Sequence, residues 1–357
     1  MANDAAQRSG AASEGEPDPE GVPTKEARGK QATIETVKGP LDTSALGPTL
    51  MHEHVFVLSP EILQNHPEYW DEAVRVADAV DKLRQLKEAG VDTIVDPTVL
   101  GLGRYLPRVQ EIAAQIDLNI VAATGLYTYD ELPFFFRLKP GPGALVEGPE
   151  PMTAMFVKDI TEGIADTGVK AAILKCATDE KGVTPGVERV LRACARAHRE
   201  TGVPITTHTE AASFRGRDQQ RVFEEEGVDL SRVVIGHCGD SADLDYLREL
   251  MDKGSIIGMD RFGVDAYAPF DQRVQVVADL CEQGYADRMV LAHDAACYMD
   301  WIDQDLKQVV LPNWHYTHIS DDVLPALRER GVTDDQIDQM LVGNPKRLFD
   351  TTALGGY

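Results

Sequence analysis

Eight short apolar segments recur along the chain, and seven of them are followed by a longer segment with helix-like spacing. The apolar segments are TLM near residue 50, DTIVD near 94, NIVAAT near 121, KAAILK near 173, VPITTH near 205, RVVIGH near 235, GSIIGM near 257 and RMVLAH near 291. The helical segments include residues 72–90, 187–202 and 241–254. Near-continuous apolar strands that alternate with helices are typical of a parallel sheet covered by helices.

Eight such units predict a closed (β/α)8 TIM barrel of the α/β class. A doubly wound open sheet is the alternative, but no GxGxxG motif stands at a first strand-to-helix turn. Residues 1–30 are rich in Ala, Gly, Ser, Glu and Pro and predict a disordered tail. Residues 31–357 are therefore expected to form one barrel domain, with an irregular surface loop in the Pro- and Gly-rich stretch at 139–151.

The composition narrows the classes of partner. A formal net charge of −24 argues against nucleic acids and anionic membrane surfaces, which attract basic patches. The five cysteines form no CxxC pair, which favours reduced thiols in a cytoplasmic protein. No apolar run approaches the roughly 20 residues of a membrane span, and no signal-peptide pattern opens the chain. A small-molecule substrate is compatible with these observations.

Side chains that can bind a metal follow five of the eight predicted strands. They are His52 and His54 after the first strand, Lys175 at the end of the fourth, His208 of the fifth, His237 of the sixth and Asp294 after the eighth. The carboxyl ends of barrel strands meet at one rim, where the active sites of this fold lie. A single histidine there is often structural, but the set together predicts a metal centre. Imidazole and carboxylate ligands suit zinc and similar metals.

Lys175 does not fit this set as a simple ligand, because an ammonium group repels a metal. One interpretation is a buried lysine that is ion-paired with an acid. Another is a lysine whose pKa is shifted so that it is neutral, or one that carbon dioxide has converted to a carbamate that could bridge two metals. Among the other histidines, His293 is expected to point away from the metals, and His66 and His198 are expected to be solvated.

As a set, these motifs resemble the phosphotriesterase family of the amidohydrolase superfamily. MHEH, ILKCATDE, TTHTEA, IGHCGD and LAHDAACYMDW carry the resemblance, in the same order from about Ile34 to the C-terminus. GLYTYDELPFFF, GMDRFG and the segment that ends in Asp300-Trp301 are more similar to the phosphotriesterase-like lactonases.

The resemblance implies a binuclear centre at the C-terminal ends of the strands. His52, His54 and Asp294 would hold the more buried metal, and His208 and His237 the more exposed one. Carboxylated Lys175 and a hydroxide would bridge the two divalent ions. Zinc is the expected metal, with cobalt, iron or manganese as alternatives. The family also implies a homodimer.

The implied activity is hydrolysis of N-acyl homoserine lactones, a quorum-quenching reaction, with weak phosphotriesterase activity. The bridging hydroxide would attack the lactone carbonyl, Asp294 would transfer the proton, and Tyr127 would orient the lactone. Arg261 would hold the loops around the pocket, and the alternative interpretation is a simple salt bridge of Arg261 with Asp260 or Asp265. The residues expected to line the pocket are Tyr127, Tyr129, Arg261, Trp301 and Ala296. The segment from Tyr298 to Ile319 is expected to be a lid over an acyl chain or a helix packed on the barrel.

Three other functions remain open at this point. The main alternative is a true aryl phosphotriesterase, an organophosphate hydrolase, against which the GLYTY and DRFG motifs argue. The second is a catalytically silent barrel that serves as a binding module, against which the full set of ligands argues. The third is an isomerase or aldolase in which Lys175 forms a Schiff base.

Overall fold

The computed structural model describes residues 32–350, which belong to one compact unit of the chain. The predicted disordered tail, residues 1–30, lies outside the described residues. Eight parallel strands form one sheet in the order β11-β10-β9-β8-β7-β6-β5-β3. Their bounds are β3 (Thr49–Leu50), β5 (Thr93–Asp96), β6 (Asn119–Gly125), β7 (Ile173–Thr178), β8 (Ile205–Thr209), β9 (Val233–Ile235), β10 (Ile256–Met259) and β11 (Met289–Leu291). All eight coincide with the apolar segments of the sequence.

The two ends of this sheet meet, so it closes. Met51 N donates to Leu291 O at 3.2 Å, and Asp294 N donates to His52 O at 3.0 Å. Beyond this seam, β4 (His54–Val57) pairs in parallel with β12 (Ala296–Met299). These bonds make the (β/α)8 TIM barrel that the sequence predicts. They also place the residues after β3 beside those after β11.

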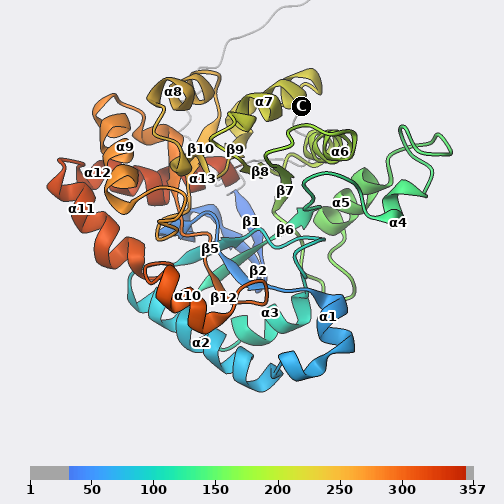
Figure 1. Ribbon diagram of the computed structural model, residues 1–357, viewed down its shortest axis with the longest axis horizontal. Helices are drawn as coiled ribbons and strands as arrows, with labels where there is room; N and C mark the ends of the chain where they lie inside the picture. The colour runs from blue at the N-terminus through green and yellow to red at the C-terminus, as the bar shows by residue number, and fades with distance from the viewer. Residues whose placement is uncertain (1–31, 351–357) are drawn as a thin grey trace, which may run out of the picture. The chain divides into compact units, whose positions relative to one another are not determined.

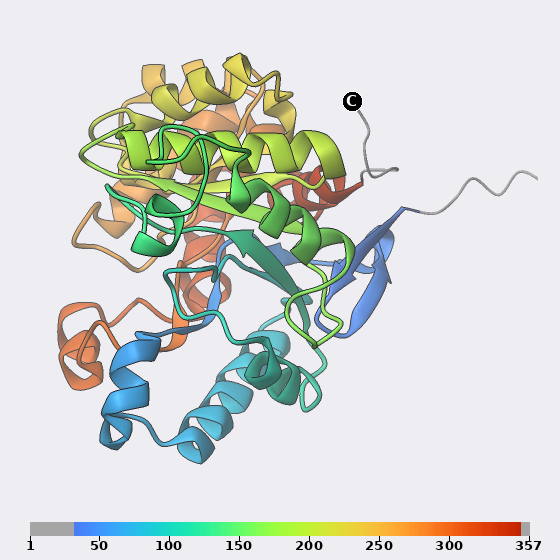
Figure 2. The same ribbon diagram turned by 90° about the vertical axis from the view of Figure 1, so that its right-hand side faces the viewer.

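Helices follow the strands and surround the barrel (Figures 1 and 2). Their bounds are α1 (Pro60–Asn65), α2 (Glu72–Glu88), α3 (Leu106–Ala113), α4 (Phe134–Arg137), α5 (Pro151–Thr161), α6 (Pro185–Thr201), α7 (Arg215–Glu225), α8 (Leu244–Asp252), α9 (Phe270–Glu282), α10 (Gln304–Val310), α11 (Leu324–Glu329), α12 (Asp334–Asp338) and α13 (Asn344–Phe349). Side-chain caps begin several of them, such as Asp71 on α2 and Thr184 on α6. A separate hairpin joins β1 (Thr33–Thr36) to β2 (Gly39–Asp42).

The core consists of apolar side chains between the strands and the helices, and inside the barrel. Leu83 and Leu86 of α2 and Val190 and Leu191 of α6 are buried against the sheet layer. Val95, Val121 and Val234, from three strands, belong to a second buried cluster. Since the strands are covered on both faces, they read as continuous apolar runs, as expected for a parallel sheet.

The connections show where sequence interpretation was right and where it was wrong. The Pro- and Gly-rich stretch is irregular until α5 begins at Pro151. The segment from Tyr298 to Ile319 contains the helix α10, which buries none of its residues, and it contributes Met299, Trp301 and Trp314 to a cavity at the barrel rim. Its role as a lid over an acyl chain stays a prediction. His66 is exposed as expected, but the prediction for His198 is wrong: its side chain is fully buried in α6, and Nδ1 lies 2.7 Å from Val203 O. Among the described residues, no helix is both long and apolar enough to cross a membrane.

Candidate metal centre

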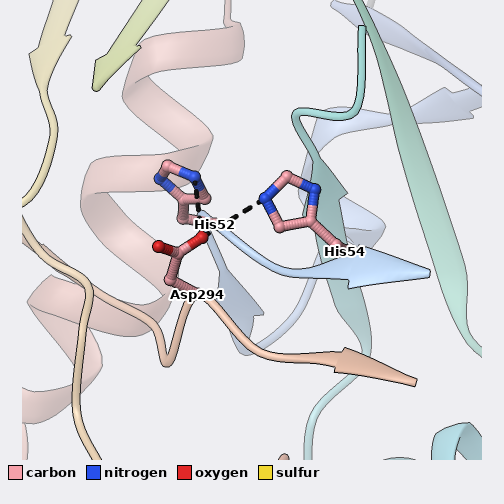
Figure 3. Close-up of side chains that lie close together, drawn as sticks. All are labelled: His52, His54 and Asp294. Atoms are coloured by element: carbon pink, nitrogen blue, oxygen red, sulfur yellow. Dashed lines mark ion pairs between the residues drawn. The ribbon is translucent and has the colours of Figure 1, made fainter. Parts of the chain in front are cut away.

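Three of the expected ligands converge at the rim, as Figure 3 shows. His52 Nε2 lies 3.3 Å and His54 Nε2 lies 3.2 Å from Asp294 Oδ1. His52 stands between β3 and β4, His54 begins β4, and Asp294 stands between β11 and β12. The seam of the barrel therefore brings together residues that are far apart in the sequence. Their donor atoms lie within 4.8 Å of one another, which is a group that could hold a metal ion.

A second group of this kind consists of His52, His237 and Asp260. Asp260, just after β10, lies 3.2 Å from Nδ1 of His52 and 2.9 Å from Nδ1 of His237, and it accepts a hydrogen bond from His237 N at 2.7 Å. With both Nδ1 atoms held by Asp260, the Nε2 atoms of the two rings face Asp294, at 3.3 and 3.7 Å. A carboxylate behind a ligating imidazole fixes its ring orientation and raises its basicity.

His208, at the end of β8, belongs to neither group but lies against them. Its ring centroid is 4.6 Å from that of His237. Nε2 is 2.8 Å from Asp179 Oδ2, and Nδ1 is turned toward Tyr127 and Arg261. Asp179 therefore directs Nδ1 of His208 into the site.

Lys175 points into the same centre from β7. Its Nζ lies 3.2 Å from Nε2 of His52, and the side chain is almost fully buried. Burial lowers the pKa of Lys175 to about 8, although Asp294 and Asp260 oppose the shift. The neutral amine, which can act as a nucleophile toward carbon dioxide, is therefore more populated near neutral pH than in an ordinary lysine.

The donor set fits divalent metal ions. Burial lowers the pKa of His52, His208 and His237, so these imidazoles are neutral and can donate a lone pair. Burial would raise the pKa of Asp294, but the hydrogen bond with His54 and the charge of Arg261 hold it well below its usual value. His54 is the exception. Burial would lower its pKa, but Asp294 and Asp96 raise it to about 9, so metal binding there would release a proton.

Two of these residues have a left-handed backbone. His237 has φ of 58° and Asp294 has φ of 55°, a region that non-glycine residues seldom occupy. Each such residue costs about 1–3 kcal/mol, and strain of this kind concentrates at functional sites. Here it turns both side chains toward the centre at the end of a strand.

Arg261 lies beside the ligands, but its partners differ from those expected. Nε donates to Asp294 Oδ2 at 3.1 Å, and Nη1 donates to Asp240 Oδ2 at 2.9 Å. Asp240 also accepts from the buried Arg273 at 2.7 Å. The predicted ion pair of Arg261 with Asp260 or Asp265 is therefore wrong. Asp260 contacts His52 and His237 instead, and Asp265 accepts a hydrogen bond from Asn313.

Tyr127 follows β6 and reaches the same space. Its hydroxyl lies 3.3 Å from His208 Nδ1 and is hydrogen-bonded to the hydroxyl of Tyr129. Burial raises the pKa of Tyr127 well above its ordinary value, and burial raises that of Tyr129 to about 12. Both phenols are therefore protonated at neutral pH and can donate hydrogen bonds.

A cavity of about 340 Å³ opens over the centre. Its floor includes His52, His54, Lys175 and Asp294. Its walls are mostly apolar or aromatic, and consist of Val57, Leu102, Tyr127, Tyr129, Val264, Tyr267, Met299, Trp301 and Trp314, with Arg261. Four of the five residues expected to line the substrate pocket are therefore present: Tyr127, Tyr129, Arg261 and Trp301.

Ala296, the fifth residue, does not line this cavity. It lines a second cavity between α2 and α10 and not the one over the histidines. Ala296 pairs with His54 across the β4–β12 ladder, but Trp314, which lines both cavities, stands at the division between them. Met299, three residues later, is the β12 residue that reaches the first cavity.

Several polar residues support the ligands without having been predicted to do so. Asp260 was expected only as a partner of Arg261, and its position at a strand end was the available signal. Thr98 Oγ1 lies 2.7 Å from His54 Nδ1, and Asp179 lies beside His208. Glu53, between the two histidines, accepts hydrogen bonds from His293 N at 2.7 Å and Ala295 N at 3.0 Å. Glu53 thereby holds the turn that carries Asp294.

His293 faces away from the ligands, as expected. Its Nδ1 lies 2.7 Å from Glu53 Oε1, and its Nε2 accepts from Ile319 N at 2.9 Å. Burial lowers its pKa to about 3, so the ring is neutral and donates through Nδ1. His293 therefore connects the metal-site turn to the segment after α10.

Comparison with known proteins agrees with this geometry. The sequence model of the Phosphotriesterase family matches residues 32–349. The chain is 62% identical over 325 residues to a phosphotriesterase homology protein of Mycobacterium tuberculosis. The alignment covers 91% of this chain and 99% of that protein. It is 39% identical over 314 residues to an aryldialkylphosphatase of Saccharolobus solfataricus, which covers 87% of this chain and 98% of that protein.

A more distant relative and a solved structure also match most of the chain. An N-acetyltaurine hydrolase of Dictyostelium discoideum is 26% identical over 374 residues, which covers 88% of this chain and 97% of that protein. A solved structure described as the phosphotriesterase from Mycobacterium tuberculosis superposes with a TM-score of 0.89 at 62% identity, and covers 91% of this chain and 100% of that chain. The chain therefore belongs to the phosphotriesterase family of hydrolases.

Proposed function

We propose that the protein is a lactonase that hydrolyses the ester ring of N-acyl homoserine lactones, with weaker activity on aryl phosphotriesters. The observation that carries this proposal is the cavity over the centre. It joins a polar floor, where the ester would react, to apolar and aromatic walls that suit an acyl chain. A phenolic donor, Tyr127, stands where the two parts meet.

The residues that would hold metal are those brought together at the rim. His52, His54 and Asp294 would hold one divalent ion, and His208 and His237 a second, with Lys175 as a carbamate between them. Zinc suits this donor set, and cobalt, iron and manganese are alternatives. Such ions polarise a carbonyl and lower the pKa of water when they are bound.

The chain's own residues supply the remaining chemistry. Asp294 is held as a carboxylate and accepts the proton of the attacking water. It then returns that proton to the alkoxide that leaves as the ring opens, so the product is an N-acyl homoserine. Tyr127 donates a hydrogen bond to the developing oxyanion. Arg261 keeps Asp294 Oδ2 in place, and Trp301 and Tyr129 would position the acyl chain and the amide.

Lys175 carboxylation has its own chemical balance and its own test. The neutral amine attacks carbon dioxide, a C–N bond forms, and one proton is released. Growth or incubation with isotope-labelled bicarbonate should give a carbamate signal by NMR in the wild-type protein and none in Lys175→Ala. A wild-type protein without that signal at full activity would contradict the proposal.

The main test is a comparison of initial rates on metal-saturated protein. The substrates would be N-acyl homoserine lactones of short to long chain and one aryl phosphotriester. Lactone turnover should exceed phosphotriester turnover, Asp294→Asn should abolish both, and Tyr127→Phe should lower kcat on lactones by roughly 10²-fold. Tyr69→Phe is the matched control, because Tyr69 is exposed and remote from the site.

The second candidate is an aryl phosphotriesterase. The relative named aryldialkylphosphatase and the solved structure described as a phosphotriesterase favour it. A phosphoryl oxygen would take the place of the carbonyl oxygen on the same floor. Phosphotriester turnover equal to or above lactone turnover would assign the protein to this activity.

We also propose a reducing, cytoplasmic location and a homodimer. The five cysteines are all free and buried, which suits a reducing compartment. They are Cys176, Cys194, Cys238, Cys281 and Cys297. Phe134, Phe135 and Leu138 on and beside α4 are exposed apolar side chains that a second copy could cover. Light scattering would test the dimer, and a monomer at micromolar concentration would contradict it.

A further inference from the structure

A second cavity, of about 330 Å³, lies between α2 and α10 and is separate from the cavity over the histidines. Figure 1 labels the two helices that border it, α2 in light blue and α10 in orange. We refer to this second cavity as the α2–α10 cavity. Its lining includes Lys82 and Gln85 of α2, and Gln304, Lys307 and Gln308 of α10. None of the candidate metal ligands lines it.

The charge of this lining is opposite to that of the chain. The protein carries 59 acidic residues and a formal net charge of −24. Nevertheless, the described residues that line the cavity include two lysines and no aspartate or glutamate. Gln85 and Gln308 add neutral amide donors, whereas Gln304 Nε2 already donates to Met299 O and Ile302 O. A concave, cationic, amide-lined surface attracts an anion.

The two lysines differ in what already binds them. Lys82 Nζ donates to Asp78 Oδ2 at 2.7 Å and to Cys297 O at 2.8 Å, so its charge is partly compensated. Among the described residues, no carboxylate pairs with Lys307. Its Nζ lies 4.4 Å from the centroid of the Trp314 ring. Burial, together with the charge of Lys82, lowers the pKa of Lys307 to about 8. An anion would therefore compensate a cation that the protein leaves half-buried.

The remaining walls of the α2–α10 cavity indicate that the ligand could also carry an apolar group. Leu311, Pro312 and Trp314 supply apolar and aromatic surface beside Lys307. A volume of this size accommodates a small ring-bearing molecule as well as an inorganic oxyanion.

The cavity also adjoins the site of reaction. Trp314 lines both cavities, and its Nε1 donates to His293 O at 2.9 Å, one residue before Asp294. A ligand that holds Lys307 and Trp314 would therefore restrain one wall of the cavity over the metal centre.

We propose that the α2–α10 cavity is a binding site for a small oxyanion, a carboxylate or a phosphate, with Lys307 as its main charged contact. The proposal does not depend on lactonase activity, because it concerns a separate cavity and its test measures binding.

The test is isothermal calorimetry on the metal-loaded protein with benzoate and with inorganic phosphate, and with neutral benzamide as a control ligand. We expect one or both anions to bind and benzamide not to bind. Lys307→Gln should weaken anion binding roughly tenfold or more, since hydrogen bonds to charged groups are the stronger class. Lys158→Gln, which removes one exposed positive charge from α5, should leave binding unchanged.

The two anions distinguish the two chemistries. Binding of benzoate alone assigns a carboxylate ligand, and binding of phosphate alone assigns a phosphate. An anion that binds at the metals instead would bind Lys307→Gln as tightly as the wild type, and that result would overturn the proposal. The absence of binding by both anions would also overturn it. If Lys307→Gln does not fold, Gln85→Leu on α2 tests the opposite wall and should weaken binding in the same direction.

Discussion

At the scale of single residues, Asp260 has the largest influence on the candidate centre without facing the cavity. It contacts Nδ1 of His52 and Nδ1 of His237, and so orients two imidazoles that come from opposite sides of the barrel seam. It is almost fully buried. Burial would raise the pKa of Asp260, but its hydrogen bonds with His237 and His52 hold it well below its usual value. The carboxylate is therefore charged, and its negative charge increases the basicity of both rings.

The corresponding prediction concerns Asp260→Asn, which keeps the shape and removes the charge. Metal affinity should fall by about 10- to 100-fold, because partners behind metal ligands have effects of this size. Competition with a chelator would measure affinity, and kcat and KM on the preferred substrate would follow it. Excess metal should restore much of the activity. Asp81→Asn, an exposed residue paired with Arg84, is the control. Unchanged metal affinity in Asp260→Asn would contradict the assigned role.

His198 gives a second prediction, on stability. It is buried in α6, and burial lowers its pKa below the ordinary value of 6.5. The unfolded chain therefore takes up a proton as pH falls below about 6.5, while the folded chain does not. Stability linked to His198 is present at neutral pH and is lost as pH falls from 6.5 toward the lower folded pKa. Each pH unit can remove up to about 1.4 kcal/mol for one such group.

Denaturant unfolding at pH 7.5 and pH 5.5 would measure this effect. The free energy of unfolding should fall less over that interval in His198→Gln than in the wild type, whatever the variant's stability at pH 7.5. His66→Gln is the matched control, because the His66 side chain is more than half exposed. Equal pH dependence in the wild type and His198→Gln would show that His198 takes up its proton at the same pH in the folded and the unfolded chain, and would contradict the prediction.

At the scale of elements, the strand ends decide where the ligands lie, and one glycine allows two of those strands to approach. Gly125 ends β6 opposite Lys175 on β7. It has φ of 147°, and a Cβ added there would lie 1.9 Å from Lys175 O. A side chain at this position would therefore push apart the strands that place Lys175 and Tyr127.

Gly125→Ala should consequently destabilise the fold by clearly more than backbone strain alone. Gly284→Ala is the control, since Gly284 also has positive φ, at 90°, but a Cβ there meets nothing within 4 Å. The control should lose about 1–2 kcal/mol from conformation, and Gly125→Ala should lose several kcal/mol and part of its bound metal. Denaturant midpoints and metal analysis would measure both. Equal losses in the two variants would mean that the β6–β7 contact relaxes freely.

The elements also show what sequence interpretation can reach. The strands, the barrel and the positions of His52, Lys175 and Asp294 follow from apolar periodicity and from residues at strand ends, which are local features. The contact of Asp260 with His52 spans 208 residues, and only the closed barrel creates it. Ala296 was misplaced because the division between the two cavities depends on how α10 and Trp314 pack. The burial of His198 reflects packing of α6 on the sheet, which its helical position alone does not reveal.

At the scale of the whole molecule, the protein carries a large excess of negative charge. A formal net charge of −24 over 357 residues produces self-repulsion that opposes the compact state. Exposed ion pairs such as Lys253 with Glu249, at 3.7 Å, contribute little against it. Raising monovalent salt from about 0.01 to 0.15 M shortens the screening length from about 30 to 8 Å. The melting temperature should therefore rise over this range, because more repulsion is screened than attraction.

A charge-reduced variant separates screening from other effects of salt. Glu88, Glu111 and Asp117 are exposed and make no ion pair that the structure records among the described residues, so E88Q/E111Q/D117N removes three negative charges without removing contacts. We expect this variant to melt at a higher temperature than the wild type at low salt, with a smaller gain on adding salt. Metal must be saturating in both, so that occupancy of the centre stays constant. Parallel salt dependence in the two proteins would show that the stability gain comes from ion exclusion at the surface, which acts regardless of net charge.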